Sequence, residues 1–433
     1  MRASPSRALL ALILAANFGG VAHAADAAAP AASSASQPES VPPAFATPFN
    51  AAQDLLRAGK GQDALAKLKE IDAAVPTLTP YEKYLVLRVR APAEYSANDP
   101  VNAANDFEVL LADSHLPPGD RLPLLKALAS VLYSSEQYAK AVGAIQRYLD
   151  AGGTDAQLRD LLPQSYYLAK DYPNAAKAYR AQVDAAYAAG KVPTEKTLRL
   201  LASAYSQSND DDGYTSILER LAVAYPKPDY WKEVVSRAQH AEKLSDRVYV
   251  DGYRLKAAAL GDVSDSERLS YAALAARAGF PVEAKKVLDD GFAKKAFTGA
   301  DLADATKQRE QATRAAAQDK AQRATSEAAA KAAKDGNASV SQGFLEVLEG
   351  DAAQGATLME QGIAKGGLKF PEEAKLHLGI AQYRAGRTAD ALATFKTVSG
   401  TGGLVPLAHA WGLLAQSQLQ ASVSPGAAAS AAK

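Results

Sequence analysis

Histidine is the side chain that most often moves protons or binds metal ions near neutral pH. Downstream of residue 24 the sequence holds four histidines: His115, His240, His377 and His409. No two of them are three or four residues apart, the spacing that would place two ligands on one helix face. A histidine-based metal site is therefore not expected. His377, in the string KLHLG, is expected to be a packing or surface residue of a helix.

Carboxylates offer no better arrangement for chemistry. The acidic run NDDDG at 209–213 lacks the spaced ligands and the final glutamate of a calcium loop. We expect a solvated turn between helices there, with a calcium site as the alternative. Asp289 and Asp290 are adjacent on a predicted helix, so their side chains point apart. Strings typical of zinc proteases, nucleophile elbows and phosphate-binding loops are absent. The sequence predicts no catalytic residue, no metal and no cofactor.

The composition limits the classes of partner. Lys+Arg and Asp+Glu both total 48, which gives a formal net charge of zero. Nucleic-acid binding needs a basic face, and an electrostatic membrane anchor needs a basic cluster, so neither is favoured. Hydrophobic residues make up 48% of the chain but aromatics only 7%, and alanine supplies much of the remainder. This composition favours helices that pack closely through small side chains.

The N-terminal string MRASPSRALLALILAANFGGVAHA is typical of a secretory signal peptide. Arg2 and Arg7 precede a short apolar run over 8–18, and Ala22-His23-Ala24 forms a cleavage site. An uncleaved anchor is the alternative, but the run is short for a membrane span. We predict a signal peptide over 1–24 with cleavage near Ala24/Ala25, and a periplasmic protein. Cysteine is absent, which excludes disulfides and a lipid-bearing cysteine. The Ala/Pro/Ser-rich 25–44 and the tail 422–433 are predicted to stay disordered.

One spacing recurs between these ends: a small residue, another twelve positions later, and a large apolar residue four after that. In LGIAQYRAGRTADALATFKTV the three are Gly379, Ala391 and Phe395. On two antiparallel helices the small residues would let the backbones approach, and the aromatic would fill the space beside them. The first positions of this register, imperfect in two cases, are Ala52, Ala91, Ala129, Pro163, Ala202, Ala272, Gly343 and Gly379. Gaps of 70 and 71 residues leave room for degenerate hairpins near 231–260 and within 301–334.

The register resembles the tetratricopeptide repeat, a unit of two antiparallel helices, over about residues 45–420. The strings AGFPVEAKKVLDDGF and MEQGIAKGGLKFPEEAKLHLGIAQYRAG also resemble exported proteobacterial members, some of which accompany TonB-type systems. The resemblance implies an all-α solenoid of about ten antiparallel helical hairpins in a right-handed superhelix, each touching only its neighbours. The predicted repeats occupy 45–300 and 337–421, and the second set ends in a capping helix with Trp411.

The Ala- and charge-rich segment 301–336 departs from this pattern. It has no large apolar residue after Leu302, so it has strong helix propensity but little to bury. A thin, solvated hairpin is the first interpretation. The alternative is one continuous, protruding helix that docks a partner.

Tyrosines form the candidate binding set. Tyr95, Tyr133, Tyr167 and Tyr383 each follow the first position of a hairpin by four residues. In the family that the chain resembles, this position tends to face the concave groove, where a tyrosine offers a large contact area and few rotors to a peptide. The polar neighbours in this prediction are Lys170, Gln382 and Arg384. The alternative is that the tyrosines pack between neighbouring hairpins.

The resemblance therefore predicts a non-catalytic periplasmic scaffold that binds a peptide or protein partner of the cell envelope, in a transport or assembly system. Neither nucleic acid nor stable membrane insertion is expected. Two alternatives stay open, a solenoid that binds a glycan or small ligand, and a hydrolase of envelope polymers. The hydrolase would need titratable groups that converge in a pocket.

Overall fold

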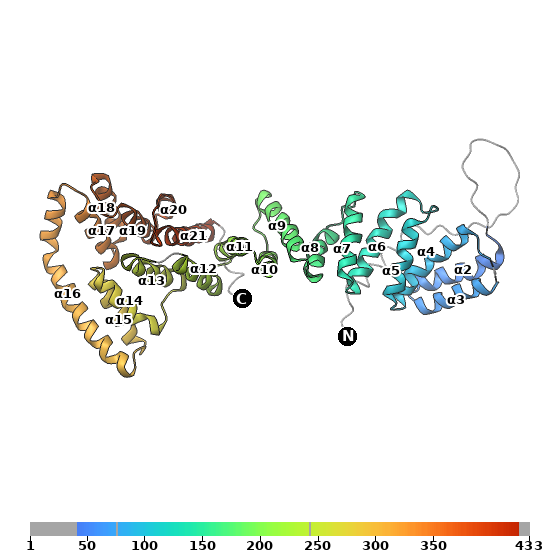
Figure 1. Ribbon diagram of the computed structural model, residues 1–433, viewed down its shortest axis with the longest axis horizontal. Coiled ribbons are helices and arrows are strands. Elements are labelled where there is room, and N and C mark those ends of the chain that lie inside the picture. The colour runs from blue at the N-terminus through green and yellow to red at the C-terminus, as the bar shows by residue number, and fades with distance from the viewer. Residues whose placement is uncertain (1–40, 75–76, 242–243, 424–433) are drawn as a thin grey trace. The chain divides into compact units, whose positions relative to one another are not determined.

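The protein is described by a computed structural model over residues 41–74, 77–241 and 244–423. Within these ranges the chain forms the α-helices α2 to α21 and one short 3-10 helix, η1 (Pro118–Asp120), without a strand (Figure 1). The all-α prediction is confirmed. The predicted signal peptide, nearly all of the predicted linker and most of the tail lie outside the described residues. No helix in the described ranges is long and apolar enough to cross a membrane.

The chain divides into two compact units, with the boundary inside α9. Unit 1 reaches Ala185 and also takes in Gln207–Asn209, and unit 2 holds the rest, to the C-terminus. The helices of unit 1 are α2 (Pro43–Arg57), α3 (Gly61–Ala74), α4 (Pro80–Ser96), α5 (Pro100–Ala112), α6 (Arg121–Ser134), α7 (Tyr138–Asp150), α8 (Ala156–Leu168) and most of α9 (Tyr172–Ala188). They pair in chain order as antiparallel hairpins.

Unit 2 continues the hairpins and adds two single helices. Its helices are α10 (Glu195–Gln207), α11 (Asp211–Ala224), α12 (Pro228–His240), α13 (Asp246–Leu260), α14 (Asp265–Arg277), α15 (Pro281–Ala293), α16 (Gly299–Ala332), α17 (Asn337–Glu349), α18 (Ala352–Lys365), α19 (Pro371–Arg384), α20 (Thr388–Phe395) and α21 (Leu404–Val423). The α12/α13 pair is the degenerate hairpin that the sequence predicted near 231–260.

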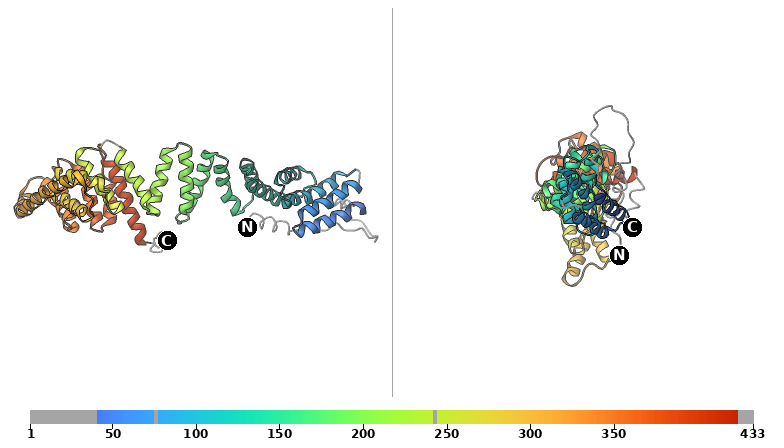
Figure 2. Two further views of the ribbon diagram at one scale, coloured as in Figure 1. Left: turned by 90° about the horizontal axis from the view of Figure 1, so that it is seen from below. Right: turned by 90° about the vertical axis from the view of Figure 1, so that its right-hand side faces the viewer.

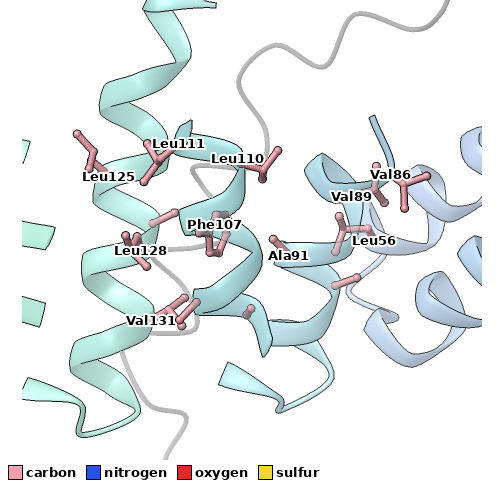
Figure 3. Packing of buried hydrophobic residues seen from close by; sticks show 14 of the residues in the cluster. Leu56, Val86, Val89, Ala91, Phe107, Leu110, Leu111, Leu125, Leu128 and Val131 are labelled. Atoms are coloured by element: carbon pink, nitrogen blue, oxygen red, sulfur yellow. The ribbon is translucent and has the colours of Figure 1, made fainter. Parts of the chain in front are cut away.

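The small residues of the register lie where paired helices approach most closely. A Cβ atom added to Gly379 would stand 2.4 Å from Cε1 of Phe395, and one added to Gly343 would stand 2.6 Å from the carbonyl oxygen of Gly355. Figure 3 shows the same arrangement in unit 1, where Phe107 of α5 lies between Ala91 of α4 and Leu128 of α6. The predicted contacts between the two helices of a hairpin are confirmed.

Each hairpin of the register turns through one residue with a left-handed backbone, seven positions after its first small residue. Their φ angles lie between 57° and 117°, and the residues are Gly59, Asn98, Glu136, Lys170, Asn209, Gly279, Gly350 and Gly386. Glycine adopts this conformation freely and asparagine tolerates it, but a longer side chain is strained there. Glu136 and Lys170 therefore carry local strain so that the two helices can meet at the required angle.

Helix α16 corrects the sequence prediction. The hairpin expected within 301–334 is wrong, because Gly299–Ala332 is one helix of 34 residues. The segment 300–335 contains neither glycine nor proline that could break it. Its buried residues are the alanines Ala305, Ala312 and Ala330, and it packs against α14, α15 and α17 of its own unit (Figure 1). The continuous helix of the second interpretation is confirmed, and its docking role stays a prediction.

The last helix, α21, packs far from its neighbours in sequence. It contacts α11, α12 and α13 as well as α19 and α20, and Figure 2 shows it in red beside the yellow-green helices of that region. Ser417 donates a hydrogen bond of 3.2 Å to the carbonyl oxygen of Val223, and His409 Nε2 lies 3.0 Å from Glu219 Oε1. The expectation that each hairpin touches only its neighbours is wrong for unit 2, because its C-terminal end folds back onto its early helices.

Glu136→Gly is expected to raise the free energy of unfolding by about 0.5–1 kcal/mol, since glycine relieves the left-handed strain at some cost in unfolded-chain entropy. The matched control is Gly59→Ala at the equivalent turn of α2/α3, where φ is 74° and space around the new methyl is open. It should lower the same quantity by about 1 kcal/mol. Urea unfolding followed by circular dichroism measures both. Equal effects of the two changes would contradict the strain.

Candidate functional site

The three predicted tyrosines of unit 1 lie on the first helices of successive hairpins, α4, α6 and α8: Tyr95, Tyr133 and Tyr167. All three rings are half-buried. Tyr133 packs edge-on against Tyr138, and Tyr167 packs edge-on against Tyr172, with ring centroids 5.5 and 5.4 Å apart. The rings are thus held by packing on one side and are partly open on the other.

Two of these tyrosines, Tyr133 and Tyr167, lie close to a further tyrosine, Tyr179. Tyr179 of α9 is buried, and its burial, followed by the nearness of Tyr133 and Tyr167, raises its pKa to about 12. Tyr95 is linked instead to the next hairpin, because its hydroxyl lies 3.1 Å from Ser134 Oγ. Lys170 forms the left-handed turn between α8 and α9 and is exposed. In unit 1 the tyrosine rings therefore pack against neighbouring side chains and stay partly accessible, and their place in a binding groove stays a prediction.

The predicted residues of unit 2 are less accessible. Gln382 is buried, donates from Nε2 to Glu360 Oε1 and accepts from Thr394 Oγ1, so its predicted place in an open groove is wrong. These two hydrogen bonds of the Gln382 side-chain amide link α19 to α18 and α20. Tyr383 is half-buried and packs edge-on against Trp411 of α21 at 5.6 Å. Arg384 is exposed at the end of α19.

Unit 2 contains a buried ionic network that the sequence did not predict. Arg254 of α13 is fully buried, and its guanidinium donates to Asp251 Oδ1 at 2.7 Å and to Glu283 Oε2 of α15 at 2.6 Å. The same guanidinium lies near two aromatic rings, 4.6 Å from the centroid of Phe280 and 4.8 Å from that of Phe344, and these two rings pack edge-on against each other. One cation therefore meets two carboxylates and two aromatic rings.

Two more side chains complete this network. The hydroxyl of Tyr271 on α14 donates to Glu283 Oε1 at 2.8 Å. His377 of α19 places Nε2 3.1 Å from both carboxylate oxygens of Asp251, and its ring stacks on Phe344 with centroids 4.0 Å apart. The network thus joins α13, α14, α15 and α19, and His377 is the link between elements that are 126 residues apart in sequence.

The electrostatics of the network favour structure over catalysis. Burial would raise the pKa of Asp251, but the neighbouring His377 and Arg254 hold it below its ordinary value. Burial, and then the charge of Glu283, raises the pKa of Tyr271 well above its ordinary value. Asp251 therefore stays ionised and Tyr271 stays protonated at neutral pH, so neither is poised to exchange a proton.

A cavity of about 520 Å³ opens beside the network, between α13, α14, α17 and α19. His377, Phe280 and Phe344 belong both to its wall and to the network. Its size lies in the range of small-ligand sites. No group of three metal-ligating side chains gathers anywhere in the described part of the chain.

The sequence held a weak signal for this network. Asp251 and Arg254 stand three residues apart in VYVDGYRL, so both charges lie on one face of a helix that is otherwise largely apolar and aromatic. Two charges on a face destined for burial indicate that each has a partner. The sequence does not identify those partners, because Glu283 and His377 lie on other helices.

A second set of charges, partly buried, lies in unit 1. Arg90 Nη2 donates to Asp106 Oδ1 at 2.9 Å, and Arg90 Nε lies 3.7 Å from Glu94 Oε1. The other oxygen of Glu94 is buried without a hydrogen bond to any described residue. Burial and the like charge of Asp106, only partly offset by Arg90, raise the pKa of Glu94 from 4.5 to about 7.

Comparisons with known proteins add little to this picture. No protein-family model matches the sequence, and no curated protein matches it. Among solved structures, a chain of the structure described as Naa15/Naa10 bound to HypK-THB matches with a TM-score of 0.34 and 16% identity. The match covers 83% of this chain and 65% of that chain, so this chain spans about two thirds of its length. A likeness at this level supports no conclusion about partners or activity, and the fold description rests on the helices themselves.

Glu94→Gln is expected to remove a pH dependence of stability. The pKa of Glu94 is higher in the folded chain than in the unfolded chain, so its protonation stabilises the fold fully below pH 4.5, and this contribution is lost as pH rises through about 7. The loss for this group amounts to at most about 3 kcal/mol. The difference in free energy of unfolding between wild type and variant, measured from pH 4.5 to 8, should follow that course. Glu108→Gln, at an exposed ion pair of the same unit, is the control, and parallel wild-type and Glu94→Gln curves would refute the prediction.

Asp251→Asn is expected to lower the free energy of unfolding by about 3 kcal/mol at pH 7, because the buried Arg254 loses one of its two counter-charges. Since the pKa of Asp251 is lowered in the folded chain, this contribution exists above its ordinary value of 3.8 and shrinks as pH falls below it. Asp229→Asn, at the exposed pair with Lys232, should change little. Chemical denaturation at pH 7 and pH 3 tests both, and similar losses for the two variants would count against a buried network.

Proposed function

We propose that the chain is an exported, non-catalytic interaction scaffold that binds a peptide or protein partner of the cell envelope. The observation that carries this proposal is the equivalent placement of Tyr95, Tyr133 and Tyr167 on α4, α6 and α8 of unit 1. Half-buried rings that neighbouring side chains hold in place lose little entropy when a partner covers them. The repeated spacing of such rings suits an extended segment that touches successive hairpins.

The proposal excludes catalysis because the titratable groups of unit 2 are occupied with one another. Asp251 and Glu283 both bind Arg254, and Tyr271 donates to Glu283. A hydrolase needs an acid or base that is free to meet substrate and water. The network contains the residue types of an active site, but its side chains bind one another, as in a structural core.

The N-terminal string supports export to the periplasm, with partners at the envelope. Its basic start, short apolar run and Ala22-His23-Ala24 are what a signal peptidase substrate requires. An export apparatus would deliver the chain from about Ala25 onward, without any cysteine that oxidation could affect.

The double variant Tyr133→Ala/Tyr167→Ala is expected to lose its partner. Wild type and variant, tagged at the C-terminus, would be crosslinked in the periplasm of the native host, and captured chains quantified by mass spectrometry. One or two envelope proteins should be recovered with wild type and reduced about tenfold with the variant, since two aromatic anchors contribute a large share of such contacts.

Tyr249→Ala is the matched control, because Tyr249 is an exposed tyrosine of unit 2, and it should retain the partner. Circular dichroism should show both variants folded, and the mass of the periplasmic protein should place its N-terminus near Ala25. Equal recovery with wild type and the double variant would remove the tyrosine surface from the proposal. Retention of the chain in the cytoplasm would contradict the proposal that it is exported.

A further inference from the structure

The cavity of unit 2 has one cation at its rim without an internal counter-ion. Arg247, Arg277 and Glu373 all line it. Glu373 is occupied by Arg247, whose Nε and Nη2 donate to its carboxylate at 2.9 and 2.8 Å. Arg277, at the end of α14, is exposed and makes no hydrogen bond or ion pair with other residues that the structure describes. The balance of charge at the rim is therefore positive.

Part of the wall of the same cavity is apolar. Phe344 and Leu345 of α17 form one side, Leu274 of α14 another, and Phe370, just before α19, the edge. Phe370 is 39% exposed, which is high for a large apolar side chain. It is held in place by the guanidinium of Arg247, which lies 3.9 Å from its ring centroid. A cavity with an apolar wall and a cationic rim matches a molecule that is apolar at one end and anionic at the other.

We propose that this cavity binds a small amphipathic carboxylate, an acyl or aryl group that carries one acid. The apolar part lies against Phe344, Leu345 and Phe370, and the carboxylate pairs with Arg277. A guanidinium presents two parallel N–H donors that fit a carboxylate, which gives both charge and direction to the contact. This site is separate from the tyrosine surface of unit 1 and does not depend on a protein partner.

The cavity selects this ligand class on size and charge. Its volume of about 520 Å³ suits a small molecule. A cationic ligand would find Glu373 already paired and would face Arg277. A glycan would need many polar groups to match its hydroxyls. Apart from the two arginines and Glu373, the polar side chains that line the cavity are Asn337, Ser341 and His377, and Asn337 already binds the backbone of Gly367 and Lys369.

The test uses one alkyl chain with three head groups. Decanoate, decan-1-ol and decylamine would each be titrated into the full mature chain by isothermal calorimetry. Decanoate should bind saturably, one molecule per chain, and about tenfold or more tighter than decan-1-ol, because the charged hydrogen bond to Arg277 is specific to the anion. Decylamine should bind most weakly.

Substitutions test the charged end and the apolar end of the site separately. Arg277→Gln should bring the affinity for decanoate down to that for decan-1-ol and leave the alcohol unaffected. The fold should survive, because Arg277 makes no hydrogen bond or ion pair with the other described residues. Phe370→Ala should weaken decanoate and decan-1-ol alike. Arg314→Gln is the matched control, since Arg314 is an exposed arginine of α16 outside the cavity, and it should change nothing.

Three results would overturn the inference. These are equal affinities of the wild type for decanoate and decan-1-ol, no saturable binding of decanoate at millimolar concentration, and equal losses in Arg277→Gln and Arg314→Gln. None of them would affect the partner proposal, because capture by the tyrosines of unit 1 is measured without any of these ligands.

Discussion

The rest of the structure depends on the close approach of two helices inside each hairpin. Small residues at both contact points bring the backbones together, and the large residue four positions on, such as Phe395 or Met359, supplies the apolar area that small residues cannot. The left-handed residue seven positions after the first contact fixes the angle at which the second helix returns. Strain at Glu136 and Lys170 shows that the angle is kept even where the side chain opposes it.

Helix α16 interrupts this pattern and has consequences for the whole of unit 2. A hairpin returns the chain to its starting side, but a single 34-residue helix carries it onward. Helices α17 to α20 then resume the hairpins in a place from which α19 meets α13. The pairs Arg247–Glu373 and Asp251–His377 are both separated by 126 residues, so the two helices run side by side in the same direction. The buried network exists because this meeting brings its partners together.

The sequence was informative wherever the determinant was local. The contact register located the hairpins from Ala52 to Gly379, and Trp231 to Leu260 was recognised as a degenerate one, because spacing and proline starts are local properties. The left-handed turn also depends on local sequence. It is hard to recognise at Glu136 and Lys170, because neither glutamate nor lysine is typical of this backbone conformation. The return of α21 and the pairing of Asp251 with His377 could not be predicted, because both depend on where α16 ends in space. The burial of Gln382 has another origin, since its partners Glu360 and Thr394 lie on the neighbouring helices α18 and α20 and its position in the register alone does not identify them.

The network and the cavity share side chains, and this links their energetics. Phe344 stacks on both Arg254 and His377 while forming a wall of the cavity, and Arg247 and Glu373 tie α13 to α19 at its rim. The cavity therefore exists only while α13 and α19 lie together. A ligand that contacts this wall binds that arrangement and not a separated one, so its binding free energy adds to the stability of the closed unit. Conversely, the ion pairs hold the wall in place before a ligand arrives, so little ordering remains to oppose binding. The buried charges act by keeping this surface assembled.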